Sequence, residues 1–398
     1  MELYILDADY QQIGMIDEAE SILWNKKYYD VGYCEIYTPY SGVIHDLLRR
    51  GNYVYRYNDD MFCKIETFEL KTNAENGDYI IVTANDMASI LEDRIVRWNT
   101  VFSGTVAEFI KRVLTDNVSN PAEAWRRIGN FVVDDSNFSS LTVRTRAKAH
   151  TEDLLTLIKT ACKSAGYGFR LSFDIETRRL VFRLYSGKDK ASAQAEEYIE
   201  FSPAYGNILS SSYKEDESNY KNVVYIGYKE LDETQSLISM YKGEEDGEPE
   251  PTGEDRREIY LESAVSREIE KADMLNLYPD ATKTDGVYYA DVDGVQTAIA
   301  IADGEGEDEK LTATNIIYLN MVRSVGWGAM SGYAKTQEFM GDVDTTDTYL
   351  YKTDYDLGDI VKVKNDYGIE AEARITEIME SEDSDNGYVV EPTFEYLN

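Results

Sequence analysis

The feature that most constrains this fold is a run of short apolar and aromatic segments over residues 1–95, separated by turn residues. Such spacing is typical of the strands of a β-barrel or sandwich. Asn76-Gly77 tolerates the positive φ of a tight hairpin turn between the last two segments. Val43–Arg50 and Asp86–Leu91, the latter capped by Asn85 or Asp86, are predicted as short helices. The predicted strands are Met1–Leu6, Ile13–Asp17, Ser21–Trp24, Glu35–Thr38, Tyr53–Tyr57, Met61–Leu70 and Tyr79–Ala84.

The hydrophobic period changes after Phe102. Apolar residues now recur at the spacing of one helical face, at Val106, Phe109, Ile110, Val113 and Leu114. Thr105 with Glu108 three residues on predicts a capping box at the start of this helix.

A second helix is predicted from an N-cap at Thr151 to Gly166, a residue that suits a left-handed C′ position. Strict alternation follows at Tyr167–Phe173 and Leu180–Leu184, which predicts a hairpin that packs on the helices. We therefore expect residues 99–200 to form an α+β domain.

Strand patterns return at Ile208 and continue to the end of the chain, interrupted by two acidic stretches. Gly243–Asp255 and Asp303–Glu309 are so rich in carboxylates that they are predicted to be solvated loops. A helix is predicted at Leu311–Val325, with Ile316, Leu319 and Val322 facing inward. No repeat with a period of 20–50 residues is present. The predicted strands are Ile208–Tyr213, Asn222–Lys229, Arg257–Glu262, Val287–Val292, Asp359–Lys364, Glu370–Glu380 and Tyr388–Tyr396, with a hairpin turn at Asn386-Gly387.

Charge and apolar content exclude several classes of protein. With 75 acidic and 40 basic residues the formal charge is −35, which argues against nonspecific binding to nucleic acid or anionic lipid. We also expect no specific nucleic-acid binding. No apolar run reaches the length of a membrane span, and Met1 leads into no signal-peptide pattern, so we expect no membrane anchor. Cys34, Cys63 and Cys162 are predicted to be buried and reduced.

The chain offers few residues for catalysis. His45 and His150 have no metal ligands or triad partners at suitable spacing. Nucleotide-binding loops and the GxSxG motif are absent, and Gly326-Trp327-Gly328 is predicted to be a turn after a helix. The strings Asp291–Gly294 and Asp383–Gly387 contain calcium-type oxygen ligands but lack a full ligand series. We therefore predict no catalytic, cofactor-binding or metal residues, no cofactor, and no enzyme activity.

Several longer strings resemble a known family. IDEAESILWNKKYYDVGYCEIYTP, LLRRGNYVYRY, KIETFELKT and ILEDRIV resemble the opening of siphophage tail-tip hub proteins of the tail-associated-lysin type. YLYKTDYDLGDIVKVKNDYGIEAEARITEIMES and GYVVEPTFEY are similar to the second barrel of that family, and the plan is similar to the central hub of the myophage baseplate. The resemblance covers both ends of the chain and is weak over Glu230–Ser331.

This resemblance implies an α+β, multi-domain fold that forms a ring-shaped homotrimer. Residues 1–98 would form the first hub barrel, 99–200 an α+β domain, 201–235 with 336–398 the second barrel, and 236–335 an inserted domain with acidic loops. The trimer would dock on the distal tail protein, contact the C-terminus of the tape-measure protein, and close the tail tube until DNA is ejected through it. Receptor-binding or lysin proteins are further expected partners. The expected location is the virion tail tip, after assembly in the host cytoplasm.

Two other classes of function stay open. A cell-wall endopeptidase or glycosidase would have to lie within residues 99–335, and the family's C-terminal lysin extension is expected to be absent because the chain stops at Asn398. A carbohydrate-binding receptor module would use tyrosines such as Tyr28-Tyr29, Tyr53/Tyr55/Tyr57 and Tyr288-Tyr289, although their spacing also suits strand packing. The acidic loops would line a channel or, as we expect from their charge density, form a solvent-facing fringe.

Overall fold

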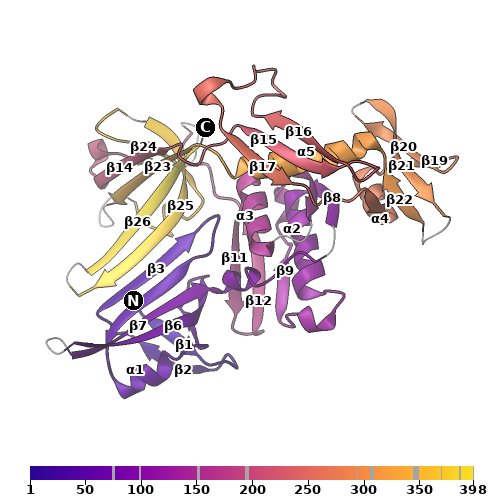
Figure 1. Ribbon diagram of the computed structural model, residues 1–398. Coiled ribbons are helices and arrows are strands. Elements are labelled where there is room, and N and C mark those ends of the chain that lie inside the picture. Colours follow the sequence, from indigo (N-terminus) through magenta and orange to yellow (C-terminus); the bar gives the residue numbers. More distant parts are fainter. Residues whose placement is uncertain are drawn as a thin grey trace.

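The computed structural model describes residues 1–73, 77–97, 100–149, 153–192, 197–292, 294–304, 309–343, 349–368, 370–384 and 387–397. The described strands form one sheet of 13 strands and four sheets of two, three, three and five strands. Helices lie mainly in the middle of the molecule, between the large sheet and the five-stranded sheet (Figure 1). Within the described residues, none of the helices is both long enough and apolar enough to cross a membrane.

The N-terminal part of the large sheet agrees with the strands predicted there. The two short helices are also confirmed, as α1 (Gly42–Leu47) and the 3-10 helix η1 (Met87–Leu91). The carboxylate of Asp86 accepts a hydrogen bond from the Ala88 amide at 2.9 Å, so Asp86 is the cap of η1. The strands are β1 (Leu3–Leu6), β2 (Gln12–Ile16), β3 (Ser21–Lys27), β4 (Tyr33–Pro39), β5 (Tyr53–Tyr55), β6 (Phe62–Asn73) and β7 (Gly77–Asp86).

The C-terminal strands belong to the same sheet. The long strand β25 pairs along its first half with β24 and along its second half with β3, so that the two ends of the chain are joined edge to edge. These strands are β13 (Glu200–Phe201), β14 (Ile208–Asp216), β23 (Thr336–Val343), β24 (Ile360–Lys364), β25 (Glu370–Asp383) and β26 (Gly387–Tyr396).

The prediction of two separate closed barrels is wrong for the described residues. Their strands form one open sheet, whose order ends at β14 on one side and at β2 on the other. The physical reason is the length of β25, which spans 14 residues. Half of one edge of β25 pairs with β3 of the N-terminal region. In a closed barrel of the C-terminal strands, that edge would instead pair with another C-terminal strand.

The large sheet nevertheless contains one five-strand arrangement twice. The second unit has the order β14-β23-β26-β25, with β24 on β25, and the first unit has the order β3-β4-β7-β6-β5. The long hairpin of each unit has a bulge, between Ile65 and Thr67 in β6 and between Ile375 and Glu377 in β25. Asn-Gly follows in both, at 76–77 and 386–387. The two bulges are thus 310 positions apart, and so are the two Asn-Gly pairs. A search for repeats with periods of 20–50 residues does not detect this spacing.

The α+β region holds two helices against two small sheets. Strands β8 and β10 pair with each other, and β11-β12-β9 form a sheet in which β9 runs parallel to β12. The elements are β8 (Thr100–Thr105), α2 (Val106–Leu114), η2 (Thr115–Ser119), η3 (Ala124–Arg126), β9 (Phe131–Asp134), η4 (Phe138–Ser140), β10 (Arg144–Ala149), α3 (Leu154–Ala165), β11 (Gly168–Asp174) and β12 (Arg179–Tyr185).

The local signals in this region are mostly confirmed. Thr105 and Glu108 make the predicted capping box, and the predicted apolar face of α2 is buried. Gly166 ends α3 with φ of +70°. The predicted N-cap Thr151 lies outside the described residues, and the cap of α3 is Asp153, whose carboxylate accepts from the Thr156 amide at 2.7 Å.

The segment between the two parts of the second unit forms two further sheets. Strands β16-β15-β17 form one, β18-β22-β21-β20-β19 form the other, and α5 packs against both. The elements are η5 (Pro203–Tyr205), β15 (Val223–Lys229), β16 (Gln235–Tyr241), η6 (Gly253–Asp255), β17 (Glu258–Glu262), β18 (Glu268–Glu270), α4 (Lys271–Leu277), β19 (Thr282–Thr284), β20 (Val287–Val292), β21 (Val295–Asp303), β22 (Lys310–Ala313) and α5 (Asn315–Ser331).

Helix α5 differs from its prediction at both ends. Residues 310–313 pair as β22 with β18 and β21, so the helix begins at Asn315 and leaves Ile316 57% exposed. At the other end the helix continues through Gly326-Trp327-Gly328, which we predicted to be a turn. A Cβ at Gly326 would lie 2.5 Å from Ile226 Cδ1, so the missing side chain is what lets α5 lie against β15.

Substitution of Gly326 tests this close approach. We expect Gly326→Val to lower the free energy of unfolding by about 1–3 kcal/mol, because the added atoms overpack the contact between α5 and β15. In contrast, a Cβ at Gly328 meets nothing within 4 Å, and Gly328→Ala should stabilise the helix by about 0.5–1 kcal/mol. Urea denaturation of both variants measures the difference, and equal effects would contradict the account.

Buried apolar side chains form four clusters. One lies in the first unit, one in the second unit, one joins the α+β helices to their sheets, and one holds α5 between β15 and the five-stranded sheet. Strand β15, which we assigned to the second barrel, packs in the last of these. The division of the chain at residues 98, 200, 235 and 335 stays a prediction.

Candidate functional site

The described residues considered for catalysis are His45, on the surface helix α1, and three buried cysteines, of which Cys34 and Cys63 share one apolar cluster. His45 lies on α1, where its Nδ1 is 3.4 Å from the Asp46 carboxylate, and His150 is outside the described residues. The thiols of Cys34, Cys63 and Cys162 are buried, and burial raises the pKa of each. Groups of three or more histidine, cysteine or carboxylate side chains that could hold a metal ion do not occur in the described part of the chain.

The candidate calcium strings form turns where they are described. The Asp291 carboxylate accepts a hydrogen bond from the Gly294 amide at 2.7 Å, next to the connection between β20 and β21. Asp293, Asp385 and Asn386 lie outside the described residues, and Gly387 starts β26 with φ of +72°. The described residues of both strings thus lie in or beside hairpin turns.

The predicted tyrosine groups lie mainly within packing contacts. Tyr53 stacks on Tyr10 and Phe62 with ring centroids 4.9 Å and 5.1 Å apart, and Phe62 stacks on Phe173 of β11 at 4.6 Å. Tyr288 is buried, and its hydroxyl donates to Glu309 at 2.8 Å. Tyr57 and Tyr289 are exposed, Tyr57 to 75%.

The two acidic loops differ from each other. Residues 245–250 are exposed, as expected of a solvated loop. Glu309, which we assigned to the second loop, is only 5% exposed and contacts the ammonium groups of Lys271 and Lys283. Hydrogen bonds from Lys283 and Tyr288 lower the pKa of Glu309 to about 2. This carboxylate therefore anchors the five-stranded sheet, and residues 305–308 lie outside the described residues.

The most connected site is a junction where the first unit, the α+β region and the C-terminal strands meet. Its centre is Tyr28, which follows β3 and is completely buried. The Tyr28 hydroxyl lies 3.0 Å from the carbonyl oxygen of Gly166 and accepts from the Gly187 amide at 3.3 Å. The Arg374 guanidinium lies 5.3 Å from the centre of the ring. One side chain thus contacts three parts of the chain.

Glycines make room for Tyr28. A Cβ at Gly168 or Gly358 would lie 2.4 Å or 2.2 Å from the ring, and a Cβ at Gly187 would lie 1.9 Å from the Gly358 carbonyl oxygen. Gly358 also has φ of +95°, a conformation that favours glycine. The backbone of Gly358 therefore lies too close to the Tyr28 ring for any larger residue to fit there, just before β24 begins at Ile360.

A network of ion pairs lies beside Tyr28. The Lys26 ammonium is 3.4 Å from Asp59 and 2.9 Å from Asp60, and Lys352 is 2.6 Å from Asp59. Burial opposes ionisation of Asp59, but Lys26 and Lys352 outweigh it and hold the pKa of Asp59 below its usual range. Residues separated by more than 290 positions are thereby joined through one carboxylate.

Arg170 of β11 extends the network into the α+β region. Its guanidinium is buried and lies 3.5 Å from Asp60, 3.8 Å from Asp86 and 3.3 Å from the Tyr185 hydroxyl. Burial raises the pKa of Asp86 to about 6, although Arg170 opposes this shift. Asp86 is thus a buried carboxylate that holds its proton more strongly than it would in water.

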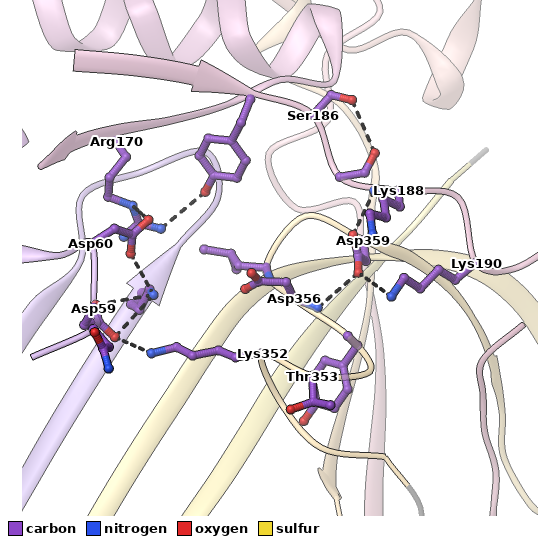
Figure 2. Close-up of a pocket in the computed structure, with 16 residues that line it drawn as sticks. Asp59, Asp60, Arg170, Ser186, Lys188, Lys190, Lys352, Thr353, Asp356 and Asp359 are labelled. Atoms are coloured by element: carbon purple, nitrogen blue, oxygen red, sulfur yellow. Dashed lines mark hydrogen bonds and ion pairs between the residues drawn. The ribbon is translucent and has the colours of Figure 1, made fainter. Parts of the chain in front are cut away.

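The ion pairs line a cavity of about 490 Å³. Figure 2 shows Lys352 reaching Asp59 on one side of it and Lys190 reaching Asp359 on the other. Asp359 also accepts hydrogen bonds from the amides of Lys188 and Asp356, at 2.8 Å and 3.0 Å. Four aspartates and five basic residues line the cavity, so that its positive and negative charges nearly cancel. We interpret it as a structural contact that joins distant segments of the chain.

The raised pKa of Asp86 gives a test by pH. In the unfolded chain this carboxyl titrates near pH 4. The folded chain therefore holds its proton more strongly, so the contribution of Asp86 to stability is full below pH 4 and is lost as the pH rises through 6. Relative to Asp86→Asn, the wild-type chain should lose about 2 kcal/mol of unfolding free energy between pH 4 and pH 7. Urea denaturation across this range measures it, and parallel pH profiles would contradict it.

Sequence reasoning did not find this junction. Lys26, Asp59, Arg170 and Lys352 are ordinary charged residues in their own segments, in a chain with 115 charged side chains. The one local signal was the predicted strand Asp359–Lys364, which gave no indication of the ion pairs of Asp359. The connection depends on long-range packing.

Comparison with solved structures finds similar tail proteins. A tail protein from Neisseria meningitidis superposes with a TM-score of 0.50 at 11% identity, over 99% of this chain and 95% of that one. Prophage tail protein gp18 from Listeria monocytogenes gives 0.45 at 12% identity, over 99% and 94%. The 43 kDa tail protein of prophage MuSo2 from Shewanella oneidensis gives 0.48 at 11% identity, over 99% and 98%.

A search of curated proteins gives no match. A family model, described as Siphovirus ReqiPepy6 Gp37-like protein, matches residues 2–394. The predicted resemblance to siphophage tail proteins is therefore confirmed. The chain belongs to the family of Siphovirus ReqiPepy6 Gp37-like proteins, a family of phage tail proteins.

Proposed function

We propose that this chain is a structural hub of the phage tail tip, which assembles into a ring of three copies and has no catalytic activity. The ring docks on the distal tail protein, contacts the C-terminus of the tape-measure protein, and closes the tail tube until DNA passes. Receptor-binding or lysin proteins attach to it from outside. It is assembled in the host cytoplasm and ends up at the tip of the virion's tail.

The repeated five-strand unit is the observation that carries this proposal. Two similar units in each chain give six similar surfaces when three chains close around an axis. A ring of that kind matches a tube with sixfold symmetry. The junction at Tyr28 and the ion pair of Asp59 with Lys352 hold the two units in a fixed relation, as a ring component requires.

The mass of the purified chain in solution tests the assembly. We expect a species of three times 45.4 kDa, either for the chain alone or after addition of the distal tail protein. Sedimentation or mass photometry measures it. A chain that stays monomeric at all concentrations and with the partner present would overturn the proposal.

Activity assays test the other two classes of function. Zymography on the host's cell walls should show no clearing, and lysis by the chain alone would favour an endopeptidase or glycosidase. Binding to purified wall polysaccharide at micromolar concentration would favour a carbohydrate-binding module, which we do not expect, because the tyrosines at 53 and 288 are engaged in packing.

The acidic loop at Gly243–Asp255 is proposed to form a solvent-facing fringe, since its carboxylates are exposed at residues 245–250. Neutralising these carboxylates should leave DNA delivery unchanged. A loss of delivery would instead place the loop in the wall of the channel.

A further inference from the structure

The contact between the two units shows how such units join. Residues Glu377–Asp383 of β25 pair antiparallel with Ser21–Lys27 of β3, with Met379 opposite Asn25 and Glu380 opposite Trp24. The directly opposed residues Glu380 and Trp24 are buried at this contact, with Glu380 1% exposed. The edge of the second unit's long hairpin therefore receives the outer strand of the first unit.

The first unit has the same edge, but within the described residues no strand covers it. Subtracting 310 from the paired residues of β25 gives residues 67–73 of β6. Strand β5 pairs with β6 only at Phe62–Lys64, on the other side of the bulge. Leu70, the equivalent of the buried Glu380, is 50% exposed, and Glu69, the equivalent of Met379, is exposed too.

The second unit likewise has an equivalent of β3. In the first unit Tyr33 of β4 pairs with Asn85 of β7 and with Asn25 of β3. In the second unit Glu338 of β23 pairs with Glu395 of β26, the equivalent of Asn85, and with Lys214 of β14. Lys214 is therefore the equivalent of Asn25, and β14 is the equivalent of β3. Strand β14 is the last strand of the sheet on its side.

We propose that β14 of one copy of this chain pairs antiparallel with residues 67–73 of β6 in the next copy. The register follows from the contact between β3 and β25, and it places Glu69 opposite Lys214 and Leu70 opposite Tyr213. This inference rests on the proposed trimer, for which it supplies the contact between copies. Three copies then close with six strand junctions, in which the pairings β3 with β25 and β14 with β6 alternate.

The side chains of the two strands are compatible in this register. Across the seven pairs no two acidic residues face each other, which matters for a chain with a charge of −35. Glu69 faces a lysine, and the exposed Leu70 faces the ring of Tyr213. The pairs are Thr67 with Asp216, Phe68 with Glu215, Glu69 with Lys214, Leu70 with Tyr213, Lys71 with Ser212, Thr72 with Ser211 and Asn73 with Ser210.

Cysteine cross-linking tests the register in the full chain. In Glu69→Cys with Lys214→Cys, the two positions are directly opposite in neighbouring copies, where Cβ atoms lie about 4.5–5.5 Å apart. Mild oxidation should then give a covalent trimer, visible as a band of three times 45.4 kDa on a non-reducing gel. Both positions are exposed, and the native cysteines are buried, so folding and background are little affected.

Two control pairs of cysteines show how much cross-linking to expect from a mismatched pair and from a pair within one chain. Glu69→Cys with Glu215→Cys shifts one partner by a single residue to the opposite face of the strand, and it should give at least tenfold less covalent trimer. Ser21→Cys with Asp383→Cys joins positions that already face each other in one chain, and it should close within a single copy.

The outcomes separate this inference from the proposed function. A trimer in solution that gives no cross-link with the matched pair, or an equal cross-link with the shifted pair, would overturn the strand pairing and leave the trimer intact. A chain that is monomeric by mass would overturn both.

Discussion

Tyr28→Ala is expected to lower the free energy of unfolding by about 3–5 kcal/mol. The ring is completely buried and touches the backbone at Gly168 and Gly358, so its removal leaves a cavity that this backbone cannot readily fill. The hydroxyl's partners, Gly166 and Gly187, would lose their contacts as well. Urea denaturation followed by tryptophan fluorescence measures the change.

Two further tyrosine variants divide this effect into its parts. Tyr28→Phe keeps the ring and should cost about 1–3 kcal/mol for the buried polar groups that it leaves without the hydroxyl. Tyr367→Ala removes a ring that is 88% exposed, and its effect should stay within about 0.5 kcal/mol. If Tyr28→Ala behaved like Tyr367→Ala, Tyr28 would not hold the junction together.

Arg170→Met is expected to lower the free energy of unfolding by about 3–5 kcal/mol at pH 7. Methionine fills much of the volume, but it leaves the buried carboxylate of Asp86 without its nearest positive charge. Adding Asp86→Asn should restore part of the loss, because the double variant has no uncompensated charge at that position. Urea denaturation of the single and double variants measures both effects.

Arg183→Met is the matched control for Arg170. Its guanidinium pairs with Asp134 at 2.9 Å, but the side chain is 52% exposed. Solvent screens such a pair, so the loss should be below about 1 kcal/mol. Equal losses at Arg170 and Arg183 would show that the buried network is no more important than a surface ion pair.

Local signals in the sequence predicted local structure well. The capping box of Thr105 and Glu108, the left-handed Gly166 and the alternating hairpin after it all depend on neighbours within a few residues. Such interactions are set by spacing alone. The same reasoning placed the strands of both five-strand units except β23, which was not among the predicted strands.

Long-range contacts were beyond this reasoning. The junction joins Lys26, Asp59 and Lys352 through packing that no short window contains. Gly326 was taken for a turn residue because its contact with Ile226 comes from a distant strand. The barrel prediction failed for the same reason, since the pairing of β25 with β3 connects opposite ends of the chain.

The repeated unit left only faint marks in the sequence. Asn76-Gly77 and Asn386-Gly387 were both recognised as turns, and their equal distance from Ile65 and Ile375 was the remaining clue. The bulges that complete the match are backbone features without a residue signature. Strand order and register therefore reveal a similarity that side-chain identity does not.

Electron cryomicroscopy of the phage tail tip tests the central claim most directly. The account predicts three copies of this chain in one ring at the distal end of the tail tube, with β14 of each copy beside β6 of the next. A different copy number at that position, a location along the tube or on the head, or absence from the virion would contradict it.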